Sequence, residues 1–147
     1  MVRPSPYVFS LMLCILVQIE TVEAVSQLEE VVKDTLYPAR ARAFINLGLA
    51  RQKVGDDTGA EEAFDRVVAM DRTNSIALLE LAKYRYAADD FRAAAMHYDT
   101  YKRVVRQQSA SALWLGIRLA RVAGDHDAEA SYALALGSRF PLSPEHQ

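Results

Sequence analysis

Apolar and small residues recur along this chain with a period of 34 residues. In each period an aromatic residue follows an alanine by four positions, which places both side chains on one face of a helix. A leucine followed by a small residue marks a second helix, where a neighbouring helix can cross closely. In three successive periods the recurring positions are Leu47, Leu81 and Leu115; Gly48, Ala82 and Gly116; Ala60, Ala94 and Ala128; and Phe64, Tyr98 and Tyr132.

Turn-forming residues separate two helices within each period. These turns contain Gly55-Asp56-Asp57, Asp89-Asp90 and Gly124-Asp125-His126-Asp127. The aspartates there fit ordinary turn and helix-capping chemistry. The pattern therefore predicts helices over 41–54, 59–70, 75–88, 91–105, 110–123 and 127–139.

A period of 34 residues built from helix pairs is typical of the tetratricopeptide repeat, in which each pair buries its apolar face against the next. The predicted fold is all-α, a tetratricopeptide-repeat superhelix of antiparallel helix pairs. Complete repeats cover 41–74, 75–108 and 109–142, and a half repeat at 26–40 precedes them, so the repeat domain is 26–147. Within the half repeat, 26–37 is expected to be its second helix, closed by Pro38. Such stacks hold partners, so a binding function is expected.

Residues 1–25 form an apolar, signal-like segment with an almost wholly apolar run over 7–17. The run is too short to span a bilayer but fits a secretory signal, with a cleavage site at Val22-Glu23-Ala24. This targeting interpretation is favoured. In the alternative, 7–18 is a degenerate first helix packed on the helix at 26–37. Cys14, the only cysteine, is a small hydrophobe in one interpretation and a lipidation site in another, although the large Leu13 precedes it.

The formal charge of -2 and the pI near 5.9 argue against a phosphate-binding protein, so no nucleic-acid partner is expected. One aromatic and basic stretch, 98–106, is the exception, but its tyrosines recur at core positions. The three histidines, His97, His126 and His146, match no metal-ligand spacing. No catalytic motif is present. We therefore expect no enzyme activity, no cofactor, no metal and no small-molecule substrate.

Repeat geometry locates the expected binding groove, because the first helix of each pair lines the concave side of such a superhelix. An apolar groove of this kind suits an amphipathic helix or an extended apolar peptide. Leu49, Tyr86 and Ile117 belong to the outward part of the groove. The residues expected to line it are Leu49, Gln52, Leu79, Lys83, Tyr86, Leu113, Ile117 and Arg121.

Several runs resemble a known family beyond what repeat packing requires. They include Ala112-Leu113-Trp114-Leu115-Gly116-Ile117-Arg118 and the ending Phe140-Pro141 with Ser143-Pro144-Glu145. Over about 27–147 the chain resembles the C-terminal half of the type IV pilus biogenesis and stability protein, the tetratricopeptide pilotin. The resemblance implies an outer-membrane lipoprotein that faces the periplasm and helps the pilus secretin assemble. It also implies about six repeats, more than this sequence contains.

Two functional hypotheses follow. In the first, the chain is a noncatalytic scaffold for the pilus secretin or another pilus-assembly protein, at the periplasmic side of the outer membrane, with membrane association through its N-terminus. In the second, it is a general tetratricopeptide adaptor that binds another peptide or helix in the cytoplasm. A truncated, non-functional pilotin paralogue is a further alternative. Neither the oligomeric state nor the cleavage of the N-terminus can be determined from the sequence.

Overall fold

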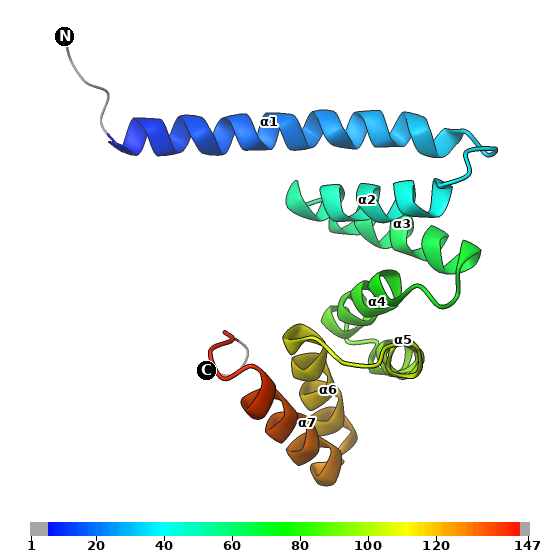
Figure 1. The fold of residues 1–147 in the computed structure, drawn as a ribbon, viewed down its shortest axis with the longest axis vertical. Coiled ribbons are helices and arrows are strands. Elements are labelled where there is room, and N and C mark those ends of the chain that lie inside the picture. Colours follow the sequence, from blue (N-terminus) through cyan, green and yellow to red (C-terminus); the bar gives the residue numbers. More distant parts are fainter. Residues whose placement is uncertain (1–5, 145–147) are drawn as a thin grey trace. The chain divides into compact units, whose positions relative to one another are not determined.

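A computed structural model describes the backbone of residues 6–144 and the side chains of residues 20–144. Every regular element in that part of the chain is an α-helix, which confirms the predicted all-α class (Figure 1). The helices form two compact units, Met1–Met70 and Asp71–Gln147, which are described separately below. Their order is α1 (Pro6–Lys33), α2 (Arg40–Lys53), α3 (Asp57–Met70), α4 (Ser75–Ala87), α5 (Phe91–Val104), α6 (Ala110–Ala123) and α7 (His126–Arg139).

Six of these helices lie within two residues of their predicted bounds, because the turn residues cap them as their chemistry requires. The carboxylates of Asp56, Asp90 and Asp125 accept hydrogen bonds from backbone N–H groups at the starts of α3, α5 and α7, at 2.9–3.1 Å. One residue in each of these turns adopts a positive φ: Gly55, Asp89 and Gly124. Each turn therefore reverses the chain between the two helices of a pair.

The third helix pair keeps the 34-residue period at its crossing, although its N-caps do not. Gly116 of α6 lies against Tyr132 of α7, 16 residues on, as Gly48 of α2 lies against Phe64 of α3. The N-caps Ala39, Asn74 and Ser109 are 35 residues apart at both steps. A helix can therefore begin one residue later without changing the face that it turns to its partner.

The first unit begins with a helix that is longer than expected. Residues 7–18 and 26–33 belong to one continuous helix, α1, so they do not fold back as a pair. Neither glycine nor proline interrupts residues 7–33. The helix ends at Lys33, not at Tyr37 as predicted, because the Asp34 carboxylate accepts the Leu36 N–H at 2.9 Å in a tight turn.

The C-terminal half of α1 packs on α2, and the backbone of α1 extends beyond the α2/α3 pair at its N-terminal end (Figure 1). Val32 of α1 is buried with residues of both other helices, and Val25 and Leu28 pack beside it. This part of α1 thus covers α2 as the second helix of an earlier repeat would. The remaining members of the buried cluster are Ala43, Leu47 and Ala63.

The predicted close crossings are present. In the first unit Gly48 lies against the Phe64 ring, and a Cβ added to this glycine would lie 2.7 Å from Phe64 Cζ. In the second unit a Cβ on Gly116 would lie 2.3 Å from the Tyr98 hydroxyl and 3.1 Å from Tyr132 Cδ2. Since real Cβ contacts are longer, both helices require glycine at the crossing.

Candidate protein-binding surfaces

The predicted groove residues of the first unit lie on α2 beside α1. Leu49 is 37% exposed and lines a hollow of about 450 Å³, with Ala50 and Lys53 of α2 on one side and Ala24 of α1 on the other. Gln52 is half-buried, one turn of α2 away from Leu49. Leu49 is therefore accessible to a partner, on a surface that α1 helps to form.

The second unit carries the other predicted residues, and three of them lie on α4. Leu79 and Lys83 are half-buried, and the Lys83 ammonium donates to Glu80 at 2.7 Å. The Tyr86 ring is half-buried: the Arg118 guanidinium carbon lies 4.0 Å from its centroid, and the Phe91 ring meets it edge-on at 5.2 Å. Tyr86 is thus held in place by neighbours on α5 and α6.

The expected accessibility of Leu113 and Ile117 is wrong. Their side chains are 2% and 4% exposed, and they form a buried cluster with Leu136 of α7. The physical reason is that α7 and the residue after it cover this face of α6, where Tyr132, Ala135 and Phe140 pack against the cluster. Neither can contact a partner while α6 and α7 remain packed.

The sequence interpretation missed two accessible residues of α6, Trp114 and Arg118, which lie one helical turn apart. Trp114 is 37% exposed, and Arg118 stacks on Tyr86. Their sequence signal was the run 114–118, which repeat packing does not require.

Arg121, which was also expected to line the groove, is accessible. Its side chain is 64% exposed and donates from Nε and Nη2 to one oxygen of Glu129, at 2.9 and 2.7 Å. This pair is a surface ion pair between α6 and α7. It leaves most of the guanidinium open to solvent at the end of α6.

The two tyrosines of the aromatic and basic stretch at 98–106 belong to the protein core, whereas Arg103 and Arg106 are exposed. Tyr98 and Tyr101 are buried, and the Tyr98 hydroxyl donates to the Gln108 side chain. Burial, and then the neighbouring Tyr132, raises the pKa of Tyr98 well above its ordinary value. Burial alone would lower the pKa of Lys102, but hydrogen bonds to Asp99 and Tyr132 raise it overall. These groups stabilise the α5–α7 packing.

Other chemistry-bearing residues do not come together. Within the described part of the chain, no three residues among His, Cys, Asp and Glu lie close enough to hold a metal ion. His97 is half-buried, and exposed His126 lies 3.8 Å from Glu129. Cys14 and His146, singled out from the sequence, lie outside the side chains described. A search of the described helices finds none with the length and apolar composition needed to cross a bilayer.

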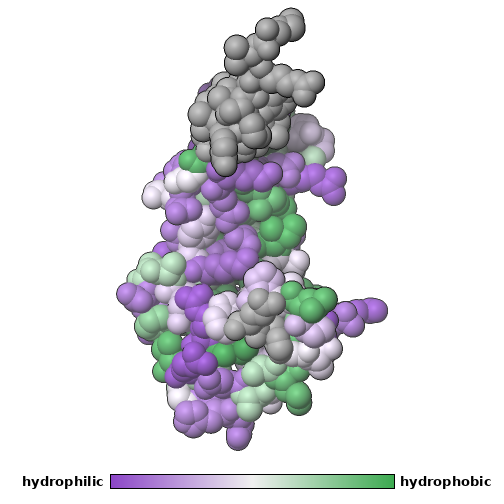
Figure 2. Space-filling view, turned by 90° about the vertical axis from the view of Figure 1, so that its left-hand side faces the viewer, coloured by the Kyte–Doolittle hydropathy of each residue, from purple (hydrophilic) through white to green (hydrophobic). Residues whose placement is uncertain are grey.

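Polar and apolar side chains alternate over the face drawn in Figure 2, with several separate hydrophobic clusters among charged residues. Large exposed hydrophobic side chains in the second unit include Ile76, Met96, Trp114, Leu134 and Leu142. Isolated exposed hydrophobic residues are normal in soluble domains, so exposure by itself does not locate a site.

Comparison with known proteins shows which proteins this chain is similar to. No protein-family model matches the chain. The sequence is 38% identical over 125 residues to the type IV pilus assembly protein PilF of Pseudomonas aeruginosa, a match that covers 85% of this chain and 49% of PilF. The chain thus spans about half the length of the curated relative it matches.

Two solved structures have the same arrangement of helices. One, reported in a functional characterization of Pseudomonas aeruginosa PilF, matches 88% of this chain and 58% of its own, with a TM-score of 0.83 and 38% identity. The other is PilW, described as a widely conserved type IV pilus biogenesis factor; it matches 86% of this chain and 58% of its own, with a TM-score of 0.68 and 28% identity. These likenesses confirm the resemblance drawn from the sequence: over most of its length the chain is similar to the tetratricopeptide-repeat proteins of type IV pilus biogenesis.

Proposed function

We propose that this chain is a noncatalytic scaffold that holds a protein partner during type IV pilus biogenesis. The observation that carries the proposal is the likeness to PilF, at 38% identity and a TM-score of 0.83. Helix pairs that expose aromatic and cationic side chains on one face are suited to holding a peptide or helix. The role is a proposal for this chain, which spans only part of its relatives.

The partner we propose is the pilus secretin, with another pilus-assembly protein as the alternative. Two surfaces would contact it: the α2 surface around Leu49, and in the second unit the cluster of Tyr86, Trp114 and Arg118. Aromatic and arginine side chains contribute disproportionately to protein interfaces. Tyr86 is also pre-organised by Arg118 and Phe91, so little conformational freedom would be lost on binding.

The location we propose is the periplasmic side of the outer membrane, with the apolar N-terminal segment acting in targeting or attachment. A fusion of residues 1–25 to a reporter that is active only in the periplasm tests this idea. Reporter activity is expected. A well-expressed but inactive fusion would contradict the targeting role.

Deletion of the gene tests the pilus role directly. In the deletion strain we expect fewer heat-stable secretin multimers and reduced twitching motility, both restored by the parent gene. Normal multimers and normal motility would contradict the proposal. In that case the general adaptor hypothesis would gain support, and fractionation would separate the two: envelope association fits the pilus role, whereas a protein confined to the cytoplasm fits the adaptor.

A binding experiment tests the surface. Secretin capture by the parent is compared with capture by Tyr86→Ala combined with Trp114→Ala, and by Leu49→Ala alone. An interface anchor typically loses about 2 kcal/mol or more on truncation, which is roughly thirtyfold in affinity. Met96→Ala is the matched control, since Met96 is 61% exposed on α5 and outside these surfaces. Equal capture by all folded variants would exclude both surfaces.

A further inference from the structure

A second hollow in the first unit lies away from the surfaces proposed above. It has a volume of about 520 Å³ and is lined by all three helices of the unit, α1, α2 and α3. Its apolar floor is formed by Val32, Leu47 and Ala63, which are 8%, 2% and 2% exposed, and by the partly buried Phe44. The floor therefore belongs to the buried core of the unit, whereas the rim is charged.

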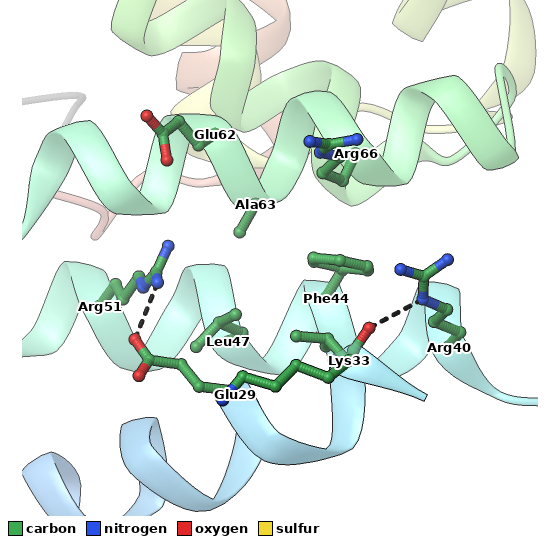
Figure 3. A pocket seen from close by; sticks show the side chains of 10 residues that line it. Glu29, Lys33, Arg40, Phe44, Leu47, Arg51, Glu62, Ala63 and Arg66 are labelled. Atoms are coloured by element: carbon green, nitrogen blue, oxygen red, sulfur yellow. Dashed lines mark hydrogen bonds and ion pairs between the residues drawn. The ribbon is translucent and has the colours of Figure 1, made fainter. Parts of the chain in front are cut away.

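The charges on the rim are unevenly distributed. Figure 3 shows Arg40, Phe44 and Arg66 together at one end of the hollow, and Glu62 and Arg51 toward the other. At that second end Arg51 is neutralised by Glu29, with 2.8 Å between Nη2 and Oε1, and its Nη1 donates to the Gly59 carbonyl at 2.8 Å. The positive charge of Arg51 at this end is thus neutralised within the protein.

The first end has positive charge that no carboxylate offsets. Among the described residues, neither Arg40 nor Arg66 forms an ion pair. Arg40 is oriented by a hydrogen bond from its Nε to the Val32 carbonyl at 2.9 Å and by the Phe44 ring, 5.4 Å from its guanidinium carbon. A positioned arginine with free N–H donors is the group that best binds a carboxylate.

We propose that this hollow binds a short acidic and apolar peptide segment of a partner protein. An aliphatic or aromatic side chain of the peptide would fill the floor against Leu47 and Ala63. A neighbouring carboxylate would lie between Arg40 and Arg66. The basis of the proposal is this charge complementarity, and it does not depend on the pilus role.

The experiment uses the full chain and two synthetic peptides. In the first, leucine and phenylalanine alternate with glutamate; in the second, lysine replaces glutamate. Fluorescence anisotropy measures affinity, and backbone amide NMR shifts locate the contact. The acidic peptide is expected to bind with shifts around the hollow, more weakly as salt is raised. The lysine peptide is expected to bind at least about tenfold more weakly.

The variant that tests the proposal reverses the charge of one arginine at the rim of the hollow. Arg66→Glu is expected to weaken the acidic peptide about tenfold or more without changing the thermal melt, because Arg66 is exposed and unpaired in the described structure. Arg92→Glu, at an exposed arginine of α5, is the matched control and should bind like the parent. Arg40→Gln should also weaken binding, with the salt dependence reduced.

Several results would overturn the proposal. Equal affinity for both peptides would show that the charge is irrelevant, and shifts confined to the second unit would place binding elsewhere. The absence of any binding would also overturn the proposal. So would an Arg66→Glu variant that is folded and binds as the parent does. Self-association that depends on Arg66 in the absence of peptide would assign the hollow to a second copy of the chain instead.

Discussion

The two units contain similar helix crossings but differ in the polar contacts that join their helices. In the first, Phe64 crosses Gly48 as a purely apolar contact, and the polar link is Arg51, which joins α2 to Glu29 of α1 and to the Gly59 carbonyl of α3. In the second, Gly116 of α6 meets Tyr132 of its own pair and also Tyr98 of α5, whose hydroxyl is bonded to Gln108. The repeat frame thus fixes where helices cross, while the polar anchoring differs between the units.

Leucine at either crossing should give the largest loss of stability. Gly48→Leu and Gly116→Leu force a side chain into the Phe64 or Tyr98 ring, which typically costs about 1–3 kcal/mol. Circular-dichroism melts of the two variants measure the effect in each unit. Ala133→Leu, at an exposed position of α7, is the control and should change stability by no more than about 0.5 kcal/mol. Parent-like melts for either glycine variant would contradict the crossing described for that unit.

Removing the charged link should affect the first unit next most strongly. Arg51→Ala leaves the Gly59 carbonyl and the Glu29 carboxylate without their arginine partner, and a hydrogen bond to a charged group typically contributes about 1.5–3 kcal/mol. Since the Arg51 side chain is only 18% exposed, solvent replaces it poorly. Urea denaturation measures the loss, and Arg51→Lys should recover only part of it. An alanine variant as stable as the parent would show that Arg51 does not stabilise this unit.

Alkaline pH should distinguish the tyrosine crossing from the phenylalanine crossing. Because the pKa of Tyr98 is raised in the folded state, its contribution is fully present below the unfolded pKa, about 10, and is lost as the pH rises above that value. The slope for one such group is up to about 1.4 kcal/mol per pH unit. In Tyr98→Phe, which itself loses about 1 kcal/mol near neutral pH, this slope should be reduced.

Urea denaturation at about pH 8 and about pH 11 measures this slope, and ultraviolet titration of the parent and of Tyr98→Phe shows how many tyrosines ionise before unfolding. Phe64→Tyr is not a suitable control, since it adds a hydroxyl to a buried apolar ring. Tyr37→Phe is suitable, because Tyr37 is 42% exposed in a turn. The same slope in the parent and in Tyr98→Phe would contradict the assignment.

The smallest effect is expected at the surface ion pair of the second unit. Arg121→Ala breaks the contact with Glu129, and exposed pairs typically contribute about 0.2–1 kcal/mol. A double-mutant cycle with Glu129→Ala isolates the interaction, which should weaken at high salt. A coupling of several kcal/mol would show that this pair matters as much as Arg51 does, and the contrast between the units would be lost.

The sequence was sufficient for the helices and their crossings, because these depend on local signals. Aspartates cap helices wherever they occur in such turns, and a glycine opposite an aromatic ring is visible in the repeat pattern. The direction of α1 was not predictable from the period, since the half repeat suggested a break near Ser26 where the chain contains no helix-breaking residue.

The candidate surface was predicted less well, for a specific reason. Leu49, Lys83, Tyr86 and Arg121 are at least partly accessible, whereas Leu113 and Ile117 are buried. Which face of a helix stays open depends on what the next helix covers, and here α7 covers Leu113 and Ile117. The partnerships of Arg118 with Tyr86 and of Arg51 with Glu29 join distant positions, and no local pattern encodes them.

The Gly116 crossing also sets a rule for building hybrid proteins from this chain. A designer who exchanges the last helix pair for a pair from another repeat protein must align the new helix on its small crossing residue, at the position of Gly116, and not on its N-cap. The N-caps Asn74 and Ser109 are 35 residues apart, so a junction aligned on caps would rotate the grafted helix by about 100°. Modular exchange in this chain is therefore defined by the crossing residues.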